Sequence, residues 1–137
     1  MSQETCKKLV ALFNRAPIQA STGMILSYNE KTEAIFDMPY QEKFNHGMGD
    51  VHGGIIATLL DNAGWFTAAA HAGKWVVTSD LNIRILEGAL TQDLKAIGHL
   101  VRLEKRLIVC QMEVYSKDSR LIANGSGSFM ISSKEIS

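Results

Sequence analysis

Residues 52–73 read HGGIIATLLDNAGWFTAAAHAG, and this run predicts one long helix that is buried on most of its surface. Apolar residues occur all round the helical repeat, so no broad polar face remains for solvent. Gly73 would end the helix, because glycine readily adopts the left-handed conformation of a C-cap. Asp61, Asn62 and His71 lie inside the run and would be costly in lipid. A buried helix of a soluble protein is therefore expected, rather than a membrane span.

Shorter elements are predicted on both sides of this helix. Residues 4–14 carry apolar residues at helical spacing and predict a short amphipathic helix, which Pro17 would end. The polar turn at 29–31 separates two apolar stretches between Thr22 and Phe36, which predict two short strands. Four further strands are predicted over 75–86, 93–103, 107–115 and 121–131.

The predicted strand directly after the helix alternates between apolar and polar residues. This alternation places Val77, Leu81 and Ile83 on one face and Thr78 on the other. Two strands, one buried helix and four consecutive strands predict an α+β domain, in which an antiparallel meander curves around the helix. A chain of 137 residues suits one such domain, so a single domain is expected over 1–137.

The composition excludes several classes of function. The 14 Lys and Arg residues balance the 14 Asp and Glu residues, so no basic field exists to hold nucleic acid or an anionic membrane surface. Cys6 and Cys110 are far apart and lack metal-ligand spacing. The first residues lack the basic-then-apolar order of a signal peptide, so a cytoplasmic location is expected.

A long glycine-rich loop over 37–50 leads into the predicted central helix. The backbone N–H groups of Gly53 and Gly54 are among the donors that lack an intrahelical partner. Together with the helix dipole, these donors would favour a carbonyl oxygen that develops negative charge. The alternative is that both glycines only allow the helix to start close to its sheet.

Asp61 is the second candidate, because a carboxylate inside an apolar helix is costly to bury unless it is paired or used. Burial would raise the pKa of Asp61 and suit it to base catalysis. A solvated or structural Asp61 is the other interpretation. His46 and His52 flank the glycine loop and are candidates for substrate binding, or His52 for orienting the loop. No third soft ligand lies nearby, so no metal site is expected.

Three stretches of the chain resemble a known family. The segment His52-Gly53-Gly54-x4-Leu59-x-Asp61-x-Ala63-Gly64 resembles the helix of hot dog fold thioesterases of the phenylacetate-pathway (PaaI-type) group. The segments Thr78-Ser79-Asp80-Leu81-Asn82-Ile83 and Gly125-Ser126-Gly127-Ser128-Phe129 resemble two strands of the same family, and the similarity extends over roughly residues 20 to 131. The resemblance implies a hot dog fold, with the sheet wrapped around a helix at about 53–72.

The resemblance also implies an activity and a set of roles. The expected reaction is hydrolysis of an acyl-CoA thioester, by a homodimer or a dimer of dimers, with coenzyme A as part of the substrate and no further cofactor. Gly53 would polarise the thioester carbonyl, with His52 and Gly54 beside it. Asp61 would act as base or nucleophile, and Thr78 would position the attacking water. Gly53 and Asp61 are about 12 Å apart along one helix, so a shared site between two chains is expected.

Some positions depart from the family or stay open. Relatives often carry Asn six residues before the motif histidine, where this chain has His46, with Asn45 one place earlier. Either residue is a candidate for that role, and the third alternative is a branch of the family in which Asp61 and Thr78 suffice. The basic residues Arg102, Lys105 and Arg106 are candidates for contacts with the phosphates of CoA, although the sequence favours a solvated basic turn.

The acyl preference is expected to depend on pocket residues such as Ile56, Leu60 and Trp65. Hot dog domains also serve as dehydratases and as acyl-CoA-binding proteins without catalysis, so both functions remain alternatives. The glycine pair after the histidine, together with Thr78, favours thioester hydrolysis over dehydration.

Overall fold

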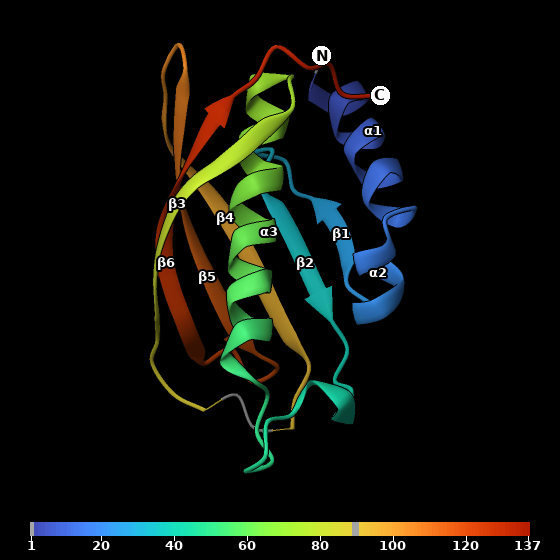
Figure 1. Cartoon of the computed structure of the whole chain (residues 1–137), viewed down its shortest axis with the longest axis vertical. Helices are drawn as coiled ribbons and strands as arrows, with labels where there is room; N and C mark the ends of the chain where they lie inside the picture. Colours follow the sequence, from blue (N-terminus) through green and yellow to red (C-terminus); the bar gives the residue numbers. More distant parts are fainter. Residues whose placement is uncertain (1, 89–90) are drawn as a thin grey trace.

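An antiparallel sheet curves around the long helix α3, Gly53–Ala72 (Figure 1). The computed structural model describes residues 2–88 and 91–137. Within these ranges the sheet has six strands: β1 Ile25–Tyr28, β2 Ala34–Met38, β3 Val76–Ile85, β4 Leu94–Leu103, β5 Leu107–Ser116 and β6 Leu121–Ile131. Helix α3 ends at Gly73 in the left-handed conformation, with φ of 68°. The predicted architecture, one antiparallel sheet wrapped around one long helix, is confirmed.

The strands lie side by side in the order β1-β2-β4-β5-β6-β3. The predicted meander is correct for β4, β5 and β6. It is wrong for β3, which pairs with β6 instead of β4. Turn residues mark where strands end, but they carry no information about the partner of a strand that follows a helix. Strand β3 therefore lies at one edge of the sheet.

Strand β3 also contains a β-bulge, and this bulge overturns the predicted alternation. Thr78 pairs with Phe129, and the next paired residue is Asp80, so Ser79 is the extra residue. Phe129 is fully buried beneath α3, so Thr78 faces the helix. Beyond the bulge Leu81 pairs with Gly127. Gly127 lies two residues before Phe129, and therefore on the same face of β6. Thr78 and Leu81 therefore lie on one face, where strict alternation predicts opposite faces.

Helix α3 packs very closely on the sheet. A Cβ atom at Gly98 of β4 would lie 2.3 Å from the carbonyl oxygen of Ala63. A Cβ atom at Gly64 would lie 2.7 Å from Cζ of Phe129. These distances are shorter than any real carbon contact, so the backbones approach each other only because the side chains are absent.

Helix α1, Ser2–Asn14, packs against one side of α3, and the shorter helix α2, Pro17–Thr22, follows it directly. Helix α1 includes the predicted 4–14, and its Phe13 packs edge to face on Phe36 and Phe66 at 5.0 and 5.5 Å. Pro17 ends this helix as expected, but it also begins α2. Proline suits the first helical position, where its missing N–H has no partner in any case.

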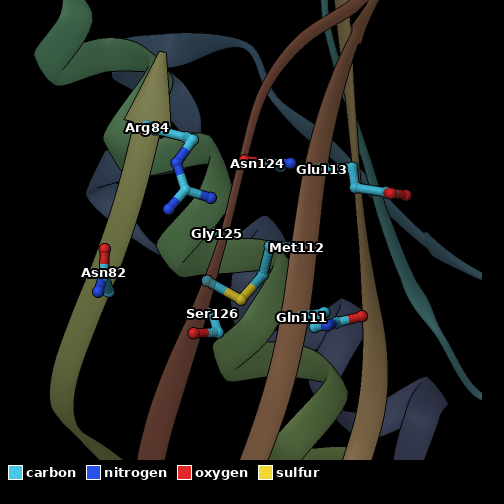
Figure 2. Close-up of a pocket in the computed structure, with 8 residues that line it drawn as sticks. All are labelled: Asn82, Arg84, Gln111, Met112, Glu113, Asn124, Gly125 and Ser126. Atoms are coloured by element: carbon cyan, nitrogen blue, oxygen red, sulfur yellow. The ribbon is translucent and has the colours of Figure 1, made fainter. Parts of the chain in front are cut away.

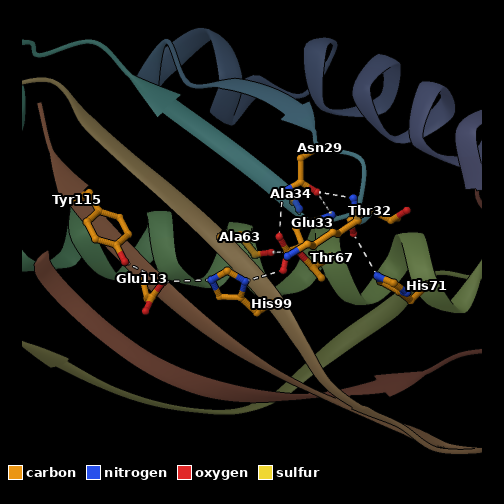
Figure 3. A network of polar contacts seen from close by, with 11 residues as sticks. Asn29, Thr32, Glu33, Ala34, Ala63, Thr67, His71, His99, Glu113 and Tyr115 are labelled. Atoms are coloured by element: carbon orange, nitrogen blue, oxygen red, sulfur yellow. Dashed lines mark hydrogen bonds and ion pairs between the residues drawn. The ribbon is translucent and has the colours of Figure 1, made fainter. Parts of the chain in front are cut away.

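A polar network ties the β1–β2 turn to the outer face of the sheet (Figure 3). His99 of β4 lies between Glu33, at 2.6 Å, and Glu113 of β5, at 3.1 Å. Partial burial by itself lowers the pKa of His99, but the hydrogen bonds and charges of both carboxylates raise it overall. His71 contacts the carbonyl oxygen of Thr32 at 3.1 Å. Both histidines therefore have structural partners.

The helices within residues 2–88 and 91–137 include none that is both long and apolar enough to cross a membrane.

Candidate active site

Asp61 and Thr78 form a hydrogen-bonded pair between α3 and the edge strand. The Thr78 hydroxyl donates to Oδ1 of Asp61 at 2.9 Å within one chain. The β-bulge makes this contact possible, since it allows Thr78 to face the helix together with the apolar residues beyond Ser79. The sequence predicts both residues as site residues, but it does not predict their direct contact.

The surroundings of Asp61 change its acidity. Burial disfavours the charged carboxylate and raises the pKa of Asp61, while the hydrogen bond from Thr78 opposes part of this shift. The direction agrees with the expectation from the sequence. A half-buried carboxylate with a raised pKa is a stronger base than an exposed aspartate, so the pair suits proton abstraction from water.

The start of α3 presents one free backbone donor. His52 is the N-cap, and its Nδ1 accepts the N–H of Gly54 at 2.8 Å. The N–H of Gly54 is therefore not available to a ligand, contrary to the expectation that both glycines offer donors. The N–H of Gly53 has no acceptor within the described residues. Because Nδ1 of His52 accepts a hydrogen bond, neutral His52 carries its proton on Nε2.

The loop before α3 is closed on itself. Asn45 bridges to Val51, and its Nδ2 donates to the Tyr40 hydroxyl at 2.7 Å. The other side-chain atom of Asn45, Oδ1, is buried and has no partner among the described residues. His46 lies in the tight turn, where its Nδ1 accepts the N–H of Met48 at 3.0 Å. Of the two loop candidates, Asn45 therefore carries the unsatisfied polar atom.

The three basic candidates lie at the β4–β5 hairpin. The carbonyl oxygen of Arg106 accepts a hydrogen bond from the N–H of Ile131. Ile131 lies at the end of β6 that pairs with Val76, the first residue of β3. Gly53 instead lies against Ile85, at the opposite end of β3. Within one chain the structure therefore does not bring Arg102, Lys105 and Arg106 together with Gly53. Arg102 is paired with Glu104 at 2.5 Å, and all three basic residues are exposed.

A mostly apolar cavity of about 470 Å³ opens beside Asp61. On the α3 side its wall contains Asp61, Asn62, Trp65 and Phe66, and Trp75 adds to it just before β3. The junction of α1 and α2 closes the other side, with Leu12, Phe13, Arg15, Ala16 and Ile18. The sequence did not predict this part of the wall, because an amphipathic helix gives no signal of what it covers.

Of the predicted pocket residues, only Trp65 lines this cavity. Ile56 and Leu60 are fully buried in the core, with exposed fractions of 1% and 0%. Helical spacing explains the difference: Trp65 lies one turn beyond Asp61 on the same face, while Leu60 and Ile56 face the sheet.

A second, polar cavity of about 230 Å³ lies on the sheet face away from α3 (Figure 2). Arg84 of β3 and Glu113 of β5 flank Asn124 of β6 there, and none of the predicted site residues contributes to it. Among the described residues no group of three or more His, Cys, Asp or Glu side chains could hold a metal ion.

Residues 48–123 match the family model of the thioesterase superfamily. The chain belongs to the thioesterase superfamily. It is 32% identical over 103 residues to a candidate esterase of Saccharolobus solfataricus, across 74% of each chain. It is 29% identical over 96 residues to acyl-coenzyme A thioesterase 13 of Homo sapiens, across 68% of this chain and 69% of that protein.

The fold of the superfamily agrees with a solved structure of the PaaI protein from the phenylacetic acid degradation operon of E. coli. The two structures superpose with a TM-score of 0.91 over 99% of each chain, at 18% identity. The predicted hot dog fold and the predicted resemblance to PaaI-type thioesterases are both confirmed. The matched segment contains Gly53, Asp61 and Thr78.

Proposed function

We propose that the protein hydrolyses acyl-CoA thioesters to a free acid and CoA, at a site shared by two protomers. The observation that carries this proposal is the half-buried, hydrogen-bonded Asp61 on the same helix as the free N–H of Gly53, in a thioesterase-superfamily chain. One group supplies a base and the other supplies a donor for an oxyanion, which are the two requirements of thioester hydrolysis.

Gly53 of one protomer polarises the thioester carbonyl. Its N–H has no acceptor in the described part of the chain, and it lies at the positive end of the dipole of α3. A hydrogen bond there strengthens as the carbonyl oxygen gains negative charge, so it stabilises the tetrahedral intermediate more than the substrate.

Asp61 of the partner protomer activates water. The carboxylate takes one proton as the water oxygen bonds to the carbonyl carbon, and collapse of the intermediate breaks the carbon–sulfur bond. The proton then passes to the departing thiolate of CoA. The Thr78 hydroxyl holds the carboxylate in place, and its oxygen lone pairs remain free to accept a hydrogen bond from the same water.

Two features support the sharing of the site. Gly53 and Asp61 lie eight residues apart on one helix, or about 12 Å, too far for both to contact one carbonyl. Strand β3 is an edge strand and exposes Val77, Leu81 and Ile85, with exposed fractions of 54%, 37% and 45%. Pairing of two such edges across a two-fold axis covers these side chains and brings Asp61 of one chain toward Gly53 of the other.

The test is thiol release from a panel of acyl-CoA substrates, measured for the wild type and for Asp61→Asn. The variant is expected to lose at least about a hundredfold in kcat, the usual scale for a positioned base. Asp37→Asn is the matched control, since Asp37 lies on the outer face of β2, and it should keep wild-type activity.

Wild-type turnover by folded Asp61→Asn would exclude the assigned role. If the wild type binds acyl-CoA but releases no thiol from any substrate, the protein is instead an acyl-CoA-binding protein without catalysis.

A further inference from the structure

We propose that the cavity between the α1–α2 junction and α3 receives the acyl group, and that it selects apolar acyl groups of medium length. This inference rests on the proposed function and assigns the substrate class of the same site. Its starting point is position: Asp61 is both the proposed base and a part of the cavity wall. A thioester carbonyl held beside Asp61 therefore has its acyl substituent at the mouth of this cavity.

The wall near α3 is aromatic. The Trp65 ring lies 4.7 Å from the Phe66 ring and 4.9 Å from the Trp75 ring, measured between centroids. The indole N–H of Trp65 donates to the carbonyl oxygen of Val76 at 2.8 Å, so the ring is fixed and its polar atom is already bonded. The cavity is therefore preformed, and an apolar group that enters it displaces no hydrogen bond of this indole.

The opposite wall comes from the α1–α2 junction, with Leu12, Phe13 and Ile18 as its apolar residues. Arg15 is the charged residue on this side, and its Nη2 donates to the main-chain oxygen of Ser137 at 2.8 Å. Asp61 and Asn62, the polar residues on the other side, are adjacent on α3. The cavity thus places Asp61 and Asn62 beside the reacting carbonyl, and apart from Arg15, which is bonded to Ser137, apolar side chains surround the rest of the acyl group.

The size of the cavity sets the expected preference. At about 470 Å³ it is far larger than an acetyl group needs and lies within the usual range for small-molecule pockets. Each additional methylene that is buried should raise kcat/KM by about fourfold. We therefore expect kcat/KM to rise by about two orders of magnitude from acetyl-CoA to hexanoyl-CoA, and to level off once the cavity is full.

The chain carries its own reporter for this cavity. It has two tryptophans, Trp65 and Trp75, and both contribute to the cavity wall. S-octyl-CoA, a thioether that cannot be hydrolysed, should change the tryptophan emission in a saturable way, whereas CoA alone should not. No saturable change with S-octyl-CoA would overturn the inference.

Two alanines of the same region provide a matched pair of variants. Ala16 lines the cavity, while Ala11 is exposed on α1 and lies outside it. Ala16→Leu should fill part of the cavity, weaken S-octyl-CoA binding by at least about tenfold and shift the preference to shorter acyl groups. Ala11→Leu should leave the S-octyl-CoA binding and the acyl-length preference unchanged. Equal effects of the two substitutions in folded proteins would overturn the inference.

The outcomes separate this inference from the proposed function. If S-octyl-CoA binds saturably, Ala16→Leu weakens this binding and no thioester is turned over, the acyl cavity is supported and the hydrolase function is excluded. If wild type and Ala16→Leu hydrolyse thioesters with the same preference for acyl length, the hydrolase function is supported and the role of the cavity in acyl binding is excluded.

Discussion

Burial raises the pKa of Asp61, and one hydrogen bond from Thr78 opposes part of this rise. Because the Thr78 hydroxyl stabilises the charged carboxylate, it holds the pKa of Asp61 below the value that burial alone would give. The proposed base acts only when deprotonated, so activity should rise as pH rises through this pKa. Thr78→Val removes the donor, raises the pKa of Asp61 further and should move the acidic limb of the kcat/KM profile to higher pH.

At the plateau of that profile, Thr78→Val should cost about two- to twelvefold in kcat, the scale of one hydrogen bond of about 0.5 to 1.5 kcal/mol. Thr78→Ser keeps the hydroxyl and should leave the limb in place. If the acidic limb of the kcat/KM profile stays in place in Thr78→Val, the hydrogen bond from Thr78 does not affect the pKa of Asp61. A loss equal to that of Asp61→Asn would instead make the hydroxyl part of the proton transfer.

At this scale the sequence identifies residues but not their contacts. Asp61 is conspicuous because it interrupts an apolar run, and Gly53 because it begins a helix. The hydrogen bond from the N–H of Gly54 to His52 depends on the rotamer of the His52 side chain. The residue type alone does not determine this rotamer. The unsatisfied oxygen of Asn45 likewise depends on how the loop closes.

The close contact between α3 and β4 depends on Gly98, which has no side chain. A Cβ atom at Gly98 would lie 2.3 Å from the Ala63 carbonyl oxygen and 2.5 Å from Oγ1 of Thr67. The first neighbour is backbone and cannot rotate away. Gly98→Ala should therefore lower the free energy of unfolding by about 1–3 kcal/mol or more, as over-packed cores do.

Denaturant unfolding of Gly98→Ala measures this loss. Gly47→Ala is its control, since a Cβ atom there meets nothing within 4 Å and should change the stability little. Equal stability of both variants would mean that α3 can shift away from the sheet without cost.

Periodicity predicts the elements far better than it predicts their pairing. The boundaries of α3 agree with the sequence because the apolar run, His52 and Gly73 all mark them locally. The pairing of β3 with β6 is a long-range contact with no local signal. The bulge at Ser79 is hidden as well, because the three consecutive polar residues Thr78, Ser79 and Asp80 do not say which of them is the extra one.

The whole assembly can be tested with two defective chains. If Gly53 and Asp61 of different protomers form one site, a heterodimer of Asp61→Ala and Gly53→Pro has one intact site and one site with both lesions. The purified heterodimer should recover about half of the wild-type activity, while each homodimer is nearly inactive. Background activity from a folded and paired heterodimer would refute the shared site.

The Gly53→Pro chain is expected to fold. Proline suits the first position of a helix, and His52 before it already has the extended conformation that a following proline requires, with φ of −61° and ψ of 137°. The nearest obstacle is Cδ1 of Ile85, the flexible end of a side chain, at 3.0 Å from a Cβ atom at position 53.

The bulge in β3 also determines which changes in chain length this strand tolerates. Loss of Ser79 would remove the extra residue and leave Thr78 and Leu81 facing the helix, as they do now. Loss of Asn82 would instead turn Ile83 and Ile85 to the outer face. When relatives are aligned, a one-residue gap at Ser79 is therefore compatible with an unchanged core, whereas a gap at Asn82 implies that the strand has been misaligned.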